Sequence, residues 1–363
     1  MKLQVTQENL SRALSSVSRI ANIRNTLPIL SNVLIRTENK RLSISATNLD
    51  IAIIHHIGAK IEKDGGITVP AKLMQEFIGS LPSSVIDLNL EGTKLTITTE
   101  KYNSTINGIV ADDFPVMPSV SKDNMFSINS DKLKKALNQV VFSAGIDDSR
   151  QVLTGVYFYT NNQELVIVAT DGYRLSEKKL GKMKDFIPVL VPSSASQDLI
   201  RIISEAGTEV NIFCDEQQAM FQAGDIELTT RLLEGKYPDY ASLIPKEFEN
   251  SATLNRNDFI EIVKVASLFA KESAYSVTIS LDSANNSVNV KSIATQVGEN
   301  VSSADAVVTN DAKITLNSKF LLDALNVFDG NKIFFGFNKN MEPSVLKDPD
   351  DDSYVHVVMP LKS

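Results

Sequence analysis

The stretch Val168-Ala-Thr-Asp-Gly-Tyr-Arg-Leu175 (VATDGYRL) decides the fold, because two related stretches occur elsewhere in the chain. SATNLDI spans 45–51 and SIATQVG spans 292–298, so an Ala-Thr pair recurs at a nearly constant spacing. Taken alone, VATDGYRL offers a hydroxyl, a carboxylate, a phenol and a guanidinium, which would suit a catalytic or phosphate-binding loop. A segment present in three copies is first a structural element, and we expect a strand that ends in a turn.

Further landmarks recur at the same spacing, which predicts three consecutive repeats of one unit. The corresponding residues are Leu10, Leu133 and Phe259 in an opening amphipathic segment, Pro70, Pro192 and Asn317 near the middle, and Phe114 and Tyr237 near the end. We expect the repeats to span 1–122, 123–246 and 247–363, with the Ser/Lys/Asp-rich PSVSKDN (118–124) as the first linker.

Each repeat contains the same pattern twice: a strand, an amphipathic helix and several strands, which together form a βαβββ-like half. In the second repeat, Ser130 or Asp131 is the expected N-cap of one helix, and Ser193 or Ser194 that of the other. Three doubled repeats predict six helices over a majority of strand.

So few helices cannot cover both faces of so many strands. The expected class is therefore α+β, with sheets on one side and helices on the other. Hairpin turns are expected at EGTK (91–94) and NNQE (161–164). Similar units stacked end to end form an arc, here a half ring, and arcs close into rings when the rotation permits.

The charge of the chain sets limits on a nucleic-acid partner. The formal net charge is −8, which argues against phosphate binding unless the cations are gathered on one surface. The expected helices carry both signs of charge, which permits a weakly positive lining but equally fits ordinary solvated helix faces. Trp is absent, and no basic residues alternate with aromatic ones. Sequence-independent phosphate contact is therefore the only supported mode of nucleic-acid binding.

The sequence does not favour a catalytic, metal or cofactor site. His55 and His56 are neighbours on an expected strand and so point to opposite faces, and His356 lies on another strand. The run DPDDD (348–352) lacks the glycine and distal glutamate of a calcium loop, so we expect a solvated hairpin. No GxGxxG or P-loop motif occurs. A hydrolase that uses Asp171 and a histidine is a remote alternative.

The remaining bulk features favour a soluble protein in a reducing compartment. The single cysteine, Cys214, is expected to be a packed strand residue and excludes an intramolecular disulfide framework. No long apolar run and no signal-peptide pattern occur, so we expect a cytoplasmic location with no membrane contact.

Four motifs resemble one known family, the bacterial beta sliding clamps of DNA polymerase III. They are TLPILSNVLI (26–35), VATDGYRL, GKYPDY (235–240) and VVMPL (357–361). The resemblance covers the whole chain and implies a head-to-tail homodimeric ring around double-stranded DNA, with helices inside and sheets outside. It further implies a non-enzymatic, nucleoid-associated processivity factor. Its partners would be a clamp loader, the catalytic subunit of DNA polymerase III, and other polymerases and repair proteins.

The resemblance also assigns residues to roles. The groove for partner peptides would comprise Leu153, Thr170, Gly172, Tyr173, Arg174, Leu175, Pro238, Leu243, Ser344, Val357, Val358, Met359, Pro360 and Leu361. DNA contacts would come from Arg24 and from helix cations, namely Lys72, Lys132, Lys135, Arg201 and Lys264. At the dimer seam, Leu268 and Phe269 would meet a first-repeat strand near Ile106.

The chain departs from the family pattern at three places. It ends Leu361-Lys362-Ser363 where many members end Met-Arg-Leu, and Ser242 stands where an arginine is often found. Gln151 and Val152 replace tyrosines that some members present to DNA. The alternative to an encircling clamp is a peptide-binding repeat scaffold that keeps the groove but forms no ring.

Overall fold

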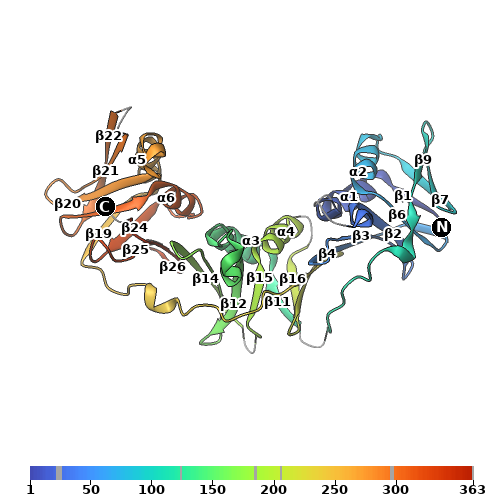
Figure 1. The fold of residues 1–363 in the computed structure, drawn as a ribbon, viewed down its shortest axis with the longest axis horizontal. Helices are drawn as coiled ribbons and strands as arrows, with labels where there is room; N and C mark the ends of the chain where they lie inside the picture. The colour runs from blue at the N-terminus through green and yellow to red at the C-terminus, as the bar shows by residue number, and fades with distance from the viewer. Residues whose placement is uncertain (22–26, 123–124, 184–185, 205–206, 295–297, 362–363) are drawn as a thin grey trace. The chain divides into compact units, whose positions relative to one another are not determined.

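The computed structural model of the chain describes residues 1–21, 27–122, 125–183, 186–204, 207–294 and 298–361 (Figure 1). These residues form two compact units. Unit 1 contains 1–134 and 197–232, and unit 2 contains 135–196 and 233–363. No helix within the described ranges is long and apolar enough to cross a membrane.

The elements follow the doubled pattern expected for each repeat. The first repeat contains β1 (Lys2–Thr6), α1 (Gln7–Ala21), β2 (Asn32–Glu38), β3 (Arg41–Thr47), β4 (Ile51–Ile57), β5 (Lys60–Lys63), β6 (Gly66–Pro70), α2 (Ala71–Ser80), β7 (Val85–Glu91), β8 (Lys94–Thr98), β9 (Asn103–Asn107) and β10 (Ile109–Val110). The second contains β11 (Met125–Asn129), α3 (Ser130–Val140), β12 (Gly155–Asn161), β13 (Glu164–Thr170), β14 (Arg174–Lys182), β15 (Val189–Pro192), α4 (Ser193–Ile203), β16 (Glu209–Cys214), β17 (Gln218–Ala223) and β18 (Ile226–Arg231).

The third repeat has the same order of elements. It contains β19 (Asn250–Asn255), α5 (Arg256–Phe269), β20 (Ser276–Asp282), β21 (Ser287–Ala294), β22 (Gly298–Val308), β23 (Ala312–Asn317), α6 (Ser318–Leu325), β24 (Lys332–Phe337), β25 (Ser344–Asp348) and β26 (Asp351–Val358). Short 3-10 turns are η1 (Pro28–Ser31), η2 (Ala111–Asp113), η3 (Val141–Ser143), η4 (Asp148–Thr154), η5 (Ala241–Leu243) and η6 (Lys271–Ser273). The expectation of two helices in each repeat is confirmed for the described residues.

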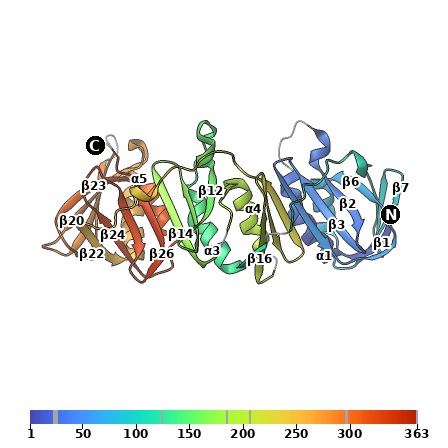
Figure 2. The same cartoon turned by 90° about the horizontal axis from the view of Figure 1, so that it is seen from below.

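The strands form three antiparallel sheets. Unit 1 holds the sheets β5-β1-β7-β8-β9 and β10-β6-β2-β3-β4-β18-β17-β16-β11. Unit 2 holds β15-β12-β13-β14-β26-β25-β24-β19-β22-β21-β20-β23. Two strand pairs connect neighbouring repeats: β4 with β18, and β14 with β26, which lie side by side in Figure 2.

The repeat landmarks have equivalent structural positions. Leu10, Leu133 and Phe259 are fully buried on α1, α3 and α5. Pro70, Pro192 and Asn317 each end the strand that precedes the second helix. The hairpins at 91–94 and 161–164 are also present as expected.

The predicted helix caps were wrong. Helix α3 already begins at Ser130, and its first turn is capped by Asn129, whose Oδ1 accepts from the Lys132 N–H at 3.1 Å. Helix α4 begins at Ser193, so Ser193 and Ser194 lie in its first turn. A preceding Asn can cap α3 because its side chain reaches the free N–H groups as well as serine does.

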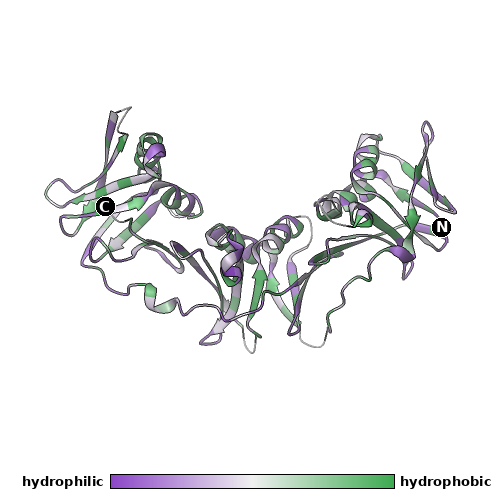
Figure 3. Ribbon diagram, in the orientation of Figure 1, coloured by the Kyte–Doolittle hydropathy of each residue, from purple (hydrophilic) through white to green (hydrophobic). Residues whose placement is uncertain are grey.

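Apolar side chains alternate with polar ones along the strands, and each helix carries an apolar stripe (Figure 3). Helix α1 packs on β2, β3 and β4, and α5 packs on β21 and β22. A core in the third repeat gathers Phe259, Phe335 and Phe337. Helices and sheets therefore cover one another in two layers within each unit, as the α+β class requires.

Candidate functional site

The stretch VATDGYRL is the turn between β13 and β14. The Thr170 Oγ1 donates to the Arg174 carbonyl at 2.6 Å and accepts from the Gly172 N–H at 3.0 Å. The Asp171 Oδ1 accepts from the Tyr173 and Arg174 N–H groups at 2.8 and 2.9 Å. The hydroxyl and the carboxylate are thus used to fix the backbone, and the expectation of a strand that ends in a turn is confirmed.

The first copy folds into the same turn, between β3 and β4. The Thr47 Oγ1 donates to the Ile51 carbonyl at 2.9 Å and accepts from the Leu49 N–H at 3.0 Å. The Asn48 Oδ1 accepts from the Ile51 N–H at 2.7 Å. Leu49 and Gly172 both have positive φ, +79° and +90°. The repeat is therefore conserved at the level of single hydrogen bonds; in the third copy, residues 295–297 lie outside the described ranges.

The C-terminal strand meets this turn in unit 2. In the β14–β26 register, Arg174 pairs with Val358 and Leu175 with Val357. The Met359 N–H donates to the Tyr173 carbonyl at 2.8 Å, so the pairing continues past the end of β26. Residues that are far apart in the sequence are thus brought together where two neighbouring interior strands of the sheet, β14 and β26, meet the turn.

An apolar cluster lies beside this junction. Leu175 and Val357 pack with Tyr237 and Tyr240, which come from the segment that follows β18. The Tyr237 ring stacks on Tyr157, with ring centroids 4.8 Å apart. The GKYPDY motif therefore supplies aromatic anchors that hold the 235–244 segment against the sheet.

A hydrogen-bonded chain of polar groups accompanies the cluster. The Tyr240 hydroxyl donates to the Glu177 carboxylate at 2.6 Å and lies 2.5 Å from the Tyr159 hydroxyl. Burial, together with the adjacent carboxylate of Glu177, raises the pKa of Tyr240 above its ordinary value. Our sequence reasoning missed Tyr157, Tyr159 and Glu177; the alternating Tyr-Phe-Tyr of β12 was the available signal.

The expected groove residues differ in accessibility. Exposed members are Gly172, Tyr173, Pro238 and Leu243; partly exposed ones are Arg174, Met359, Pro360 and Leu361. Buried members are Leu153, Thr170, Leu175, Ser344, Val357 and Val358. Val358 belongs to the core of the third repeat, so it supports the site from behind. The Ser344 hydroxyl is also used internally, because it donates to the Val358 carbonyl at 2.9 Å.

The Arg174 side chain is fixed by contacts within the chain. Its guanidinium contacts the Asp171 carboxylate at 3.1 Å and the Asp323 carboxylate at 2.6 Å. It also lies over the Phe320 ring, 4.5 Å from the centroid. These contacts anchor the turn to α6, so the aromatic and aliphatic members offer the more accessible surface.

The expected DNA-contacting cations lie on four different helices. Lys72 on α2, Lys132 on α3 and Lys264 on α5 are exposed. Lys135 forms an ion pair with Asp329, and Arg201 forms one with Asp198 at 2.7 Å. Surface ion pairs of this kind are weak and leave the cations available to a stronger anionic partner. Arg24 lies outside the described residues.

The residues expected at the dimer seam differ in solvent exposure. Leu268 is 61 % exposed on α5. Phe269 is partly exposed. Ile106 is buried inside its own unit, on β9, and β9 is the last strand of its sheet. At this seam the strand edge, rather than the Ile106 side chain, is accessible.

His55, His356 and Cys214 are packed inside the fold. The His55 Nδ1 lies 2.8 Å from the Ser16 hydroxyl, and burial lowers the pKa of His55 to about 4. Burial also lowers the pKa of His356 to about 3. Cys214 is buried on β16, which raises the pKa of its thiol to about 12. Among the described residues no group of three or more His, Cys, Asp or Glu could hold a metal ion. The acidic run 348–352 forms the β25–β26 hairpin, as expected.

Models of one known protein family match nearly the whole chain. Residues 1–118, 127–239 and 241–362 match the N-terminal, central and C-terminal domains of the DNA polymerase III beta subunit. A beta sliding clamp from Synechococcus elongatus is 31 % identical, with 100 % of this chain and 99 % of the relative covered. The Bacillus subtilis beta sliding clamp is 29 % identical, with both chains covered fully.

Solved structures agree with the sequence matches. The DNA polymerase sliding clamp of Bacillus subtilis has a TM-score of 0.94 at 27 % identity and covers 100 % of this chain and 99 % of its own. A DnaN sliding clamp from Bartonella birtlesii, solved with bound griselimycin, has a TM-score of 0.95 at 27 % identity, with both chains fully covered. The fold of this chain is thus a three-domain DNA clamp fold.

Proposed function

Because this chain belongs to the DNA polymerase III beta subunit family, the beta sliding clamps, we propose that two copies form a head-to-tail ring around double-stranded DNA. The observation that carries the proposal is a pairing rule between repeats. The third strand after the first helix of a repeat pairs with the third strand after the second helix of the next repeat. β4 pairs with β18 in this way, and β14 pairs with β26.

The same rule leaves one strand at each end of the chain without its counterpart. Among the described residues, β9 of the first repeat pairs with β8 alone. Within the same described ranges, the 298–305 part of β22 in the third repeat pairs with β21 alone. Applied once more, the rule pairs β22 of one copy with β9 of a second copy. Two such junctions close a ring of two chains, which also protects both exposed strand edges.

Exposed apolar side chains support this seam. Leu268 and Val301 are 61 % and 60 % exposed in the third repeat, on α5 and β22. Leu73 and Tyr102 are 52 % and 46 % exposed in the first repeat, on α2 and just before β9. Burial of apolar surface on both sides of the seam would stabilise the dimer in addition to the strand pairing.

A closed ring reconciles an acidic protein with a polyanionic partner. Topological linkage replaces affinity, so weak and sequence-independent contacts from helix cations suffice, and sliding remains easy. The protein then needs no catalytic group of its own and would work at the nucleoid, in the cytoplasm. Its three domains would be bounded near residues 122 and 246, between β10 and β11 and between β18 and β19.

We also propose that the surface around Tyr173 and Met359, which Leu175 and Val357 support from below, binds linear peptides of the polymerase, the clamp loader and other replication and repair proteins. Aliphatic side chains with a methionine make an adaptable apolar surface. The griselimycin complexes of related clamps support a ligand site in this family. A tethered polymerase has a high effective concentration at the primer end, which gives processivity.

Retention on circular DNA tests the ring. A clamp assembled on nicked circular DNA should be retained and should be released when the circle is linearised. Release that is indifferent to linearisation would favour the non-encircling peptide-binding scaffold. Light scattering should independently give a dimer.

The peptide site has its own test. Met359→Ala, or deletion of 359–363, should weaken binding of a polymerase-derived peptide, measured by fluorescence anisotropy. Met341→Ala is a matched control, because Met341 is an exposed methionine outside the proposed site. Unchanged peptide affinity in both site variants would refute the assignment.

A further inference from the structure

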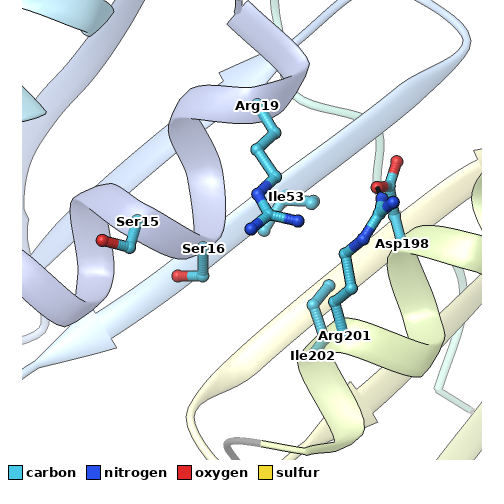
Figure 4. Close-up of a pocket in the computed structure, with 7 residues that line it drawn as sticks. All are labelled: Ser15, Ser16, Arg19, Ile53, Asp198, Arg201 and Ile202. Carbon is cyan, nitrogen blue, oxygen red and sulfur yellow. Dashed lines mark hydrogen bonds and ion pairs between the residues drawn. The ribbon is translucent and has the colours of Figure 1, made fainter.

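The helix side and the opposite sheet faces of this chain differ in what lies on them. On the helix side of unit 1, a notch between α1 and α4 is lined by charged groups, among them Arg19, Asp198 and Arg201 (Figure 4). Arg201 is paired with Asp198 and is already one of the expected DNA contacts. The sheet faces are instead covered by the segments that link the repeats, and this coverage differs from one repeat to the next.

In the second repeat, the segment after β18 covers the face that β12, β13 and β14 form. The Tyr237 ring stacks on Tyr157, with ring centroids 4.8 Å apart, and packs in one cluster with Val168. The Tyr240 hydroxyl donates to the Glu177 carboxylate at 2.6 Å. The linking segment therefore contacts one residue on each of the three strands.

The first repeat is covered in a similar way by the segment after β10. Phe114 and Ala111 of this segment pack on Leu34 of β2. The strand partner of Leu34 is Ser45, which is 3 % exposed. In both linking segments an aromatic residue comes directly before a proline, at 114–115 and at 237–238.

Strand pairing identifies the equivalent face of the third repeat. On the first strand, the position two residues after the partner of Pro70, Pro192 or Asn317 is occupied by Leu34, Tyr157 and Thr278. Their partners on the second strand are Ser45, Val168 and Lys291. The partners of these on the third strand are Ile54, Glu177 and Val301. Two residues further along the second strand lie Thr47, Thr170 and Ile293.

These equivalent positions are covered in the first two repeats and exposed in the third. Thr47 and Thr170 are 3 % and 7 % exposed, whereas Ile293 is 55 % exposed. Glu177 is half-buried, whereas Val301 is 60 % exposed. The third repeat thus presents two aliphatic side chains to solvent where the other repeats are covered.

The described residues after β26 do not supply a cover for this face. The Leu361 N–H donates to the Thr315 carbonyl of β23 at 2.9 Å. The Leu233 N–H donates in the same way to the Leu190 carbonyl of β15 at 2.9 Å. In the second repeat the covering segment follows this crossing, whereas the described ranges end at 361.

The chemistry of the exposed face indicates what would fit it. Ile293 pairs with Glu299 and Lys291 with Val301, so the two aliphatic side chains are diagonal neighbours. Lys291 and Glu299 occupy the other diagonal and form an ion pair at 2.8 Å. An aromatic ring can span diagonal cross-strand neighbours, and a lysine beside it adds a cation–π contact. Unlike Glu177, Val301 offers no acceptor for a tyrosine hydroxyl, which favours phenylalanine.

We propose that this β21–β22 face (Lys291, Ile293, Glu299 and Val301) docks an extended phenylalanine-proline segment of a partner protein. The ring would pack across the two aliphatic side chains, and the proline would keep the residue before it extended. A second copy of this chain does not supply the segment, because its Phe114 is buried. The inference does not rest on the proposed ring, since the whole face belongs to one chain.

Titration with a synthetic peptide tests the proposal. The peptide ADDFPVMPS copies residues 111–119, and the full chain is labelled at its isoleucine methyl groups for NMR. The Ile293 methyl signal should shift saturably at millimolar peptide. The same peptide with alanine in place of phenylalanine should not shift it. Absence of a saturable Ile293 shift with the phenylalanine peptide would overturn the proposal.

A substitution on the face gives a second measurement. Ile293→Ser should weaken peptide binding about tenfold in fluorescence anisotropy, because one aliphatic side chain leaves the contact. Val307→Ser is the matched control, since Val307 is 73 % exposed on β22 outside the face, and it should bind as wild type does. Equal affinity of Ile293→Ser and wild type would contradict the proposal.

The experiment also separates this face from the proposed peptide site and from the proposed ring. Loss of binding in Met359→Ala, with retention in Ile293→Ser, would place the peptide at the surface around Tyr173 and Met359 and would overturn the inference. Ile293 lies on β21, one strand away from the free edge of β22. Ile293→Ser should therefore have the same mass as wild type in light scattering, whether that mass is a monomer or a dimer.

Discussion

At the scale of single residues, the repeated turn shows what each side chain contributes to the fold. Gly172 has a φ of +90°, and a Cβ built there would lie 3.3 Å from the Arg150 Nη1. We expect Gly172→Ala to reduce the free energy of unfolding by about 1–2 kcal/mol, because an L-residue is strained at this φ. Urea unfolding measures the change.

The first copy provides the matched comparison. Leu49 already carries a side chain at the equivalent position, with a φ of +79° and about half of its surface exposed. Leu49→Gly should therefore not destabilise the protein, because relief of strain offsets the small burial that is lost. Gly58→Ala controls for the added methyl group, since it has open space and no positive φ. An equal decrease in the free energy of unfolding for Gly58→Ala and Gly172→Ala would contradict the strain argument.

His356 predicts a pH dependence of stability. Its Nδ1 lies 2.8 Å from the Ser176 hydroxyl, while its Nε2 is buried with no partner in the described structure. A neutral ring leaves only a lone pair unsatisfied there, whereas protonation would bury an unpaired N–H. Burial therefore lowers the pKa of His356 from 6.5 to about 3.

The direction in which stability changes with pH follows from which state, native or unfolded, binds the proton. Between pH 6.5 and about 3 the unfolded chain is protonated at His356 and the native chain is not, so stability falls as the pH falls. The slope is about 1.4 kcal/mol per pH unit, and it disappears above pH 6.5. In urea titrations at several pH values, His356→Gln should have a slope smaller by about 1.4 kcal/mol per pH unit, while the contribution of the buried His55, whose pKa is about 4, remains. His56→Gln, a partly exposed histidine on β4, should retain the full slope.

At the scale of elements, the sequence predicted the number and order of helices because periodicity and spacing are local signals. It misplaced the caps of α3 and α4, because several polar residues in a row can each cap a helix. It also could not predict the β14–β26 pairing, which depends on tertiary contacts between residues such as Arg174 and Val358. The tyrosine cluster around Tyr240 was missed for the same reason.

Helix α5 carries the prediction for the proposed seam. If two copies pair as proposed, Leu268→Asp should shift the proposed dimer to monomer, because a carboxylate would replace apolar surface that the proposed seam would bury. The loss of about 1.5–3 kcal/mol for one leucine raises the dissociation constant by at least tenfold. Light scattering over a concentration series measures the dissociation constant of the dimer. Val116→Asp, at a side chain 96 % exposed outside the seam, should leave the dimer intact.

At the scale of the whole molecule, the repeat explains why only one of its turns is proposed to bind peptides. The first copy has the same backbone, and the Arg231 N–H meets the Asp50 carbonyl at 2.9 Å just as Met359 meets Tyr173. Of the two turns that the structure describes, however, only the second has a glycine at the position with positive φ and lies beside residues 359–361. Sequence similarity identified these residues, whereas the ion pairs that restrain Arg174 required the structure.

The ring itself predicts the outcome of a cross-linking experiment. Thr105→Cys on β9 and Ser303→Cys on β22 place exposed thiols on the two edges that the pairing rule joins. The native Cys214 should not interfere, because its buried thiol has a pKa of about 12 and stays protonated. A flexible bis-maleimide then links two copies twice. Rings are first assembled on a linear duplex and cross-linked, and the duplex is then ligated into a circle. The cross-linked rings should stay on this circular DNA in denaturant. Each single-cysteine variant should be released, and release of the doubly linked dimer would exclude encirclement.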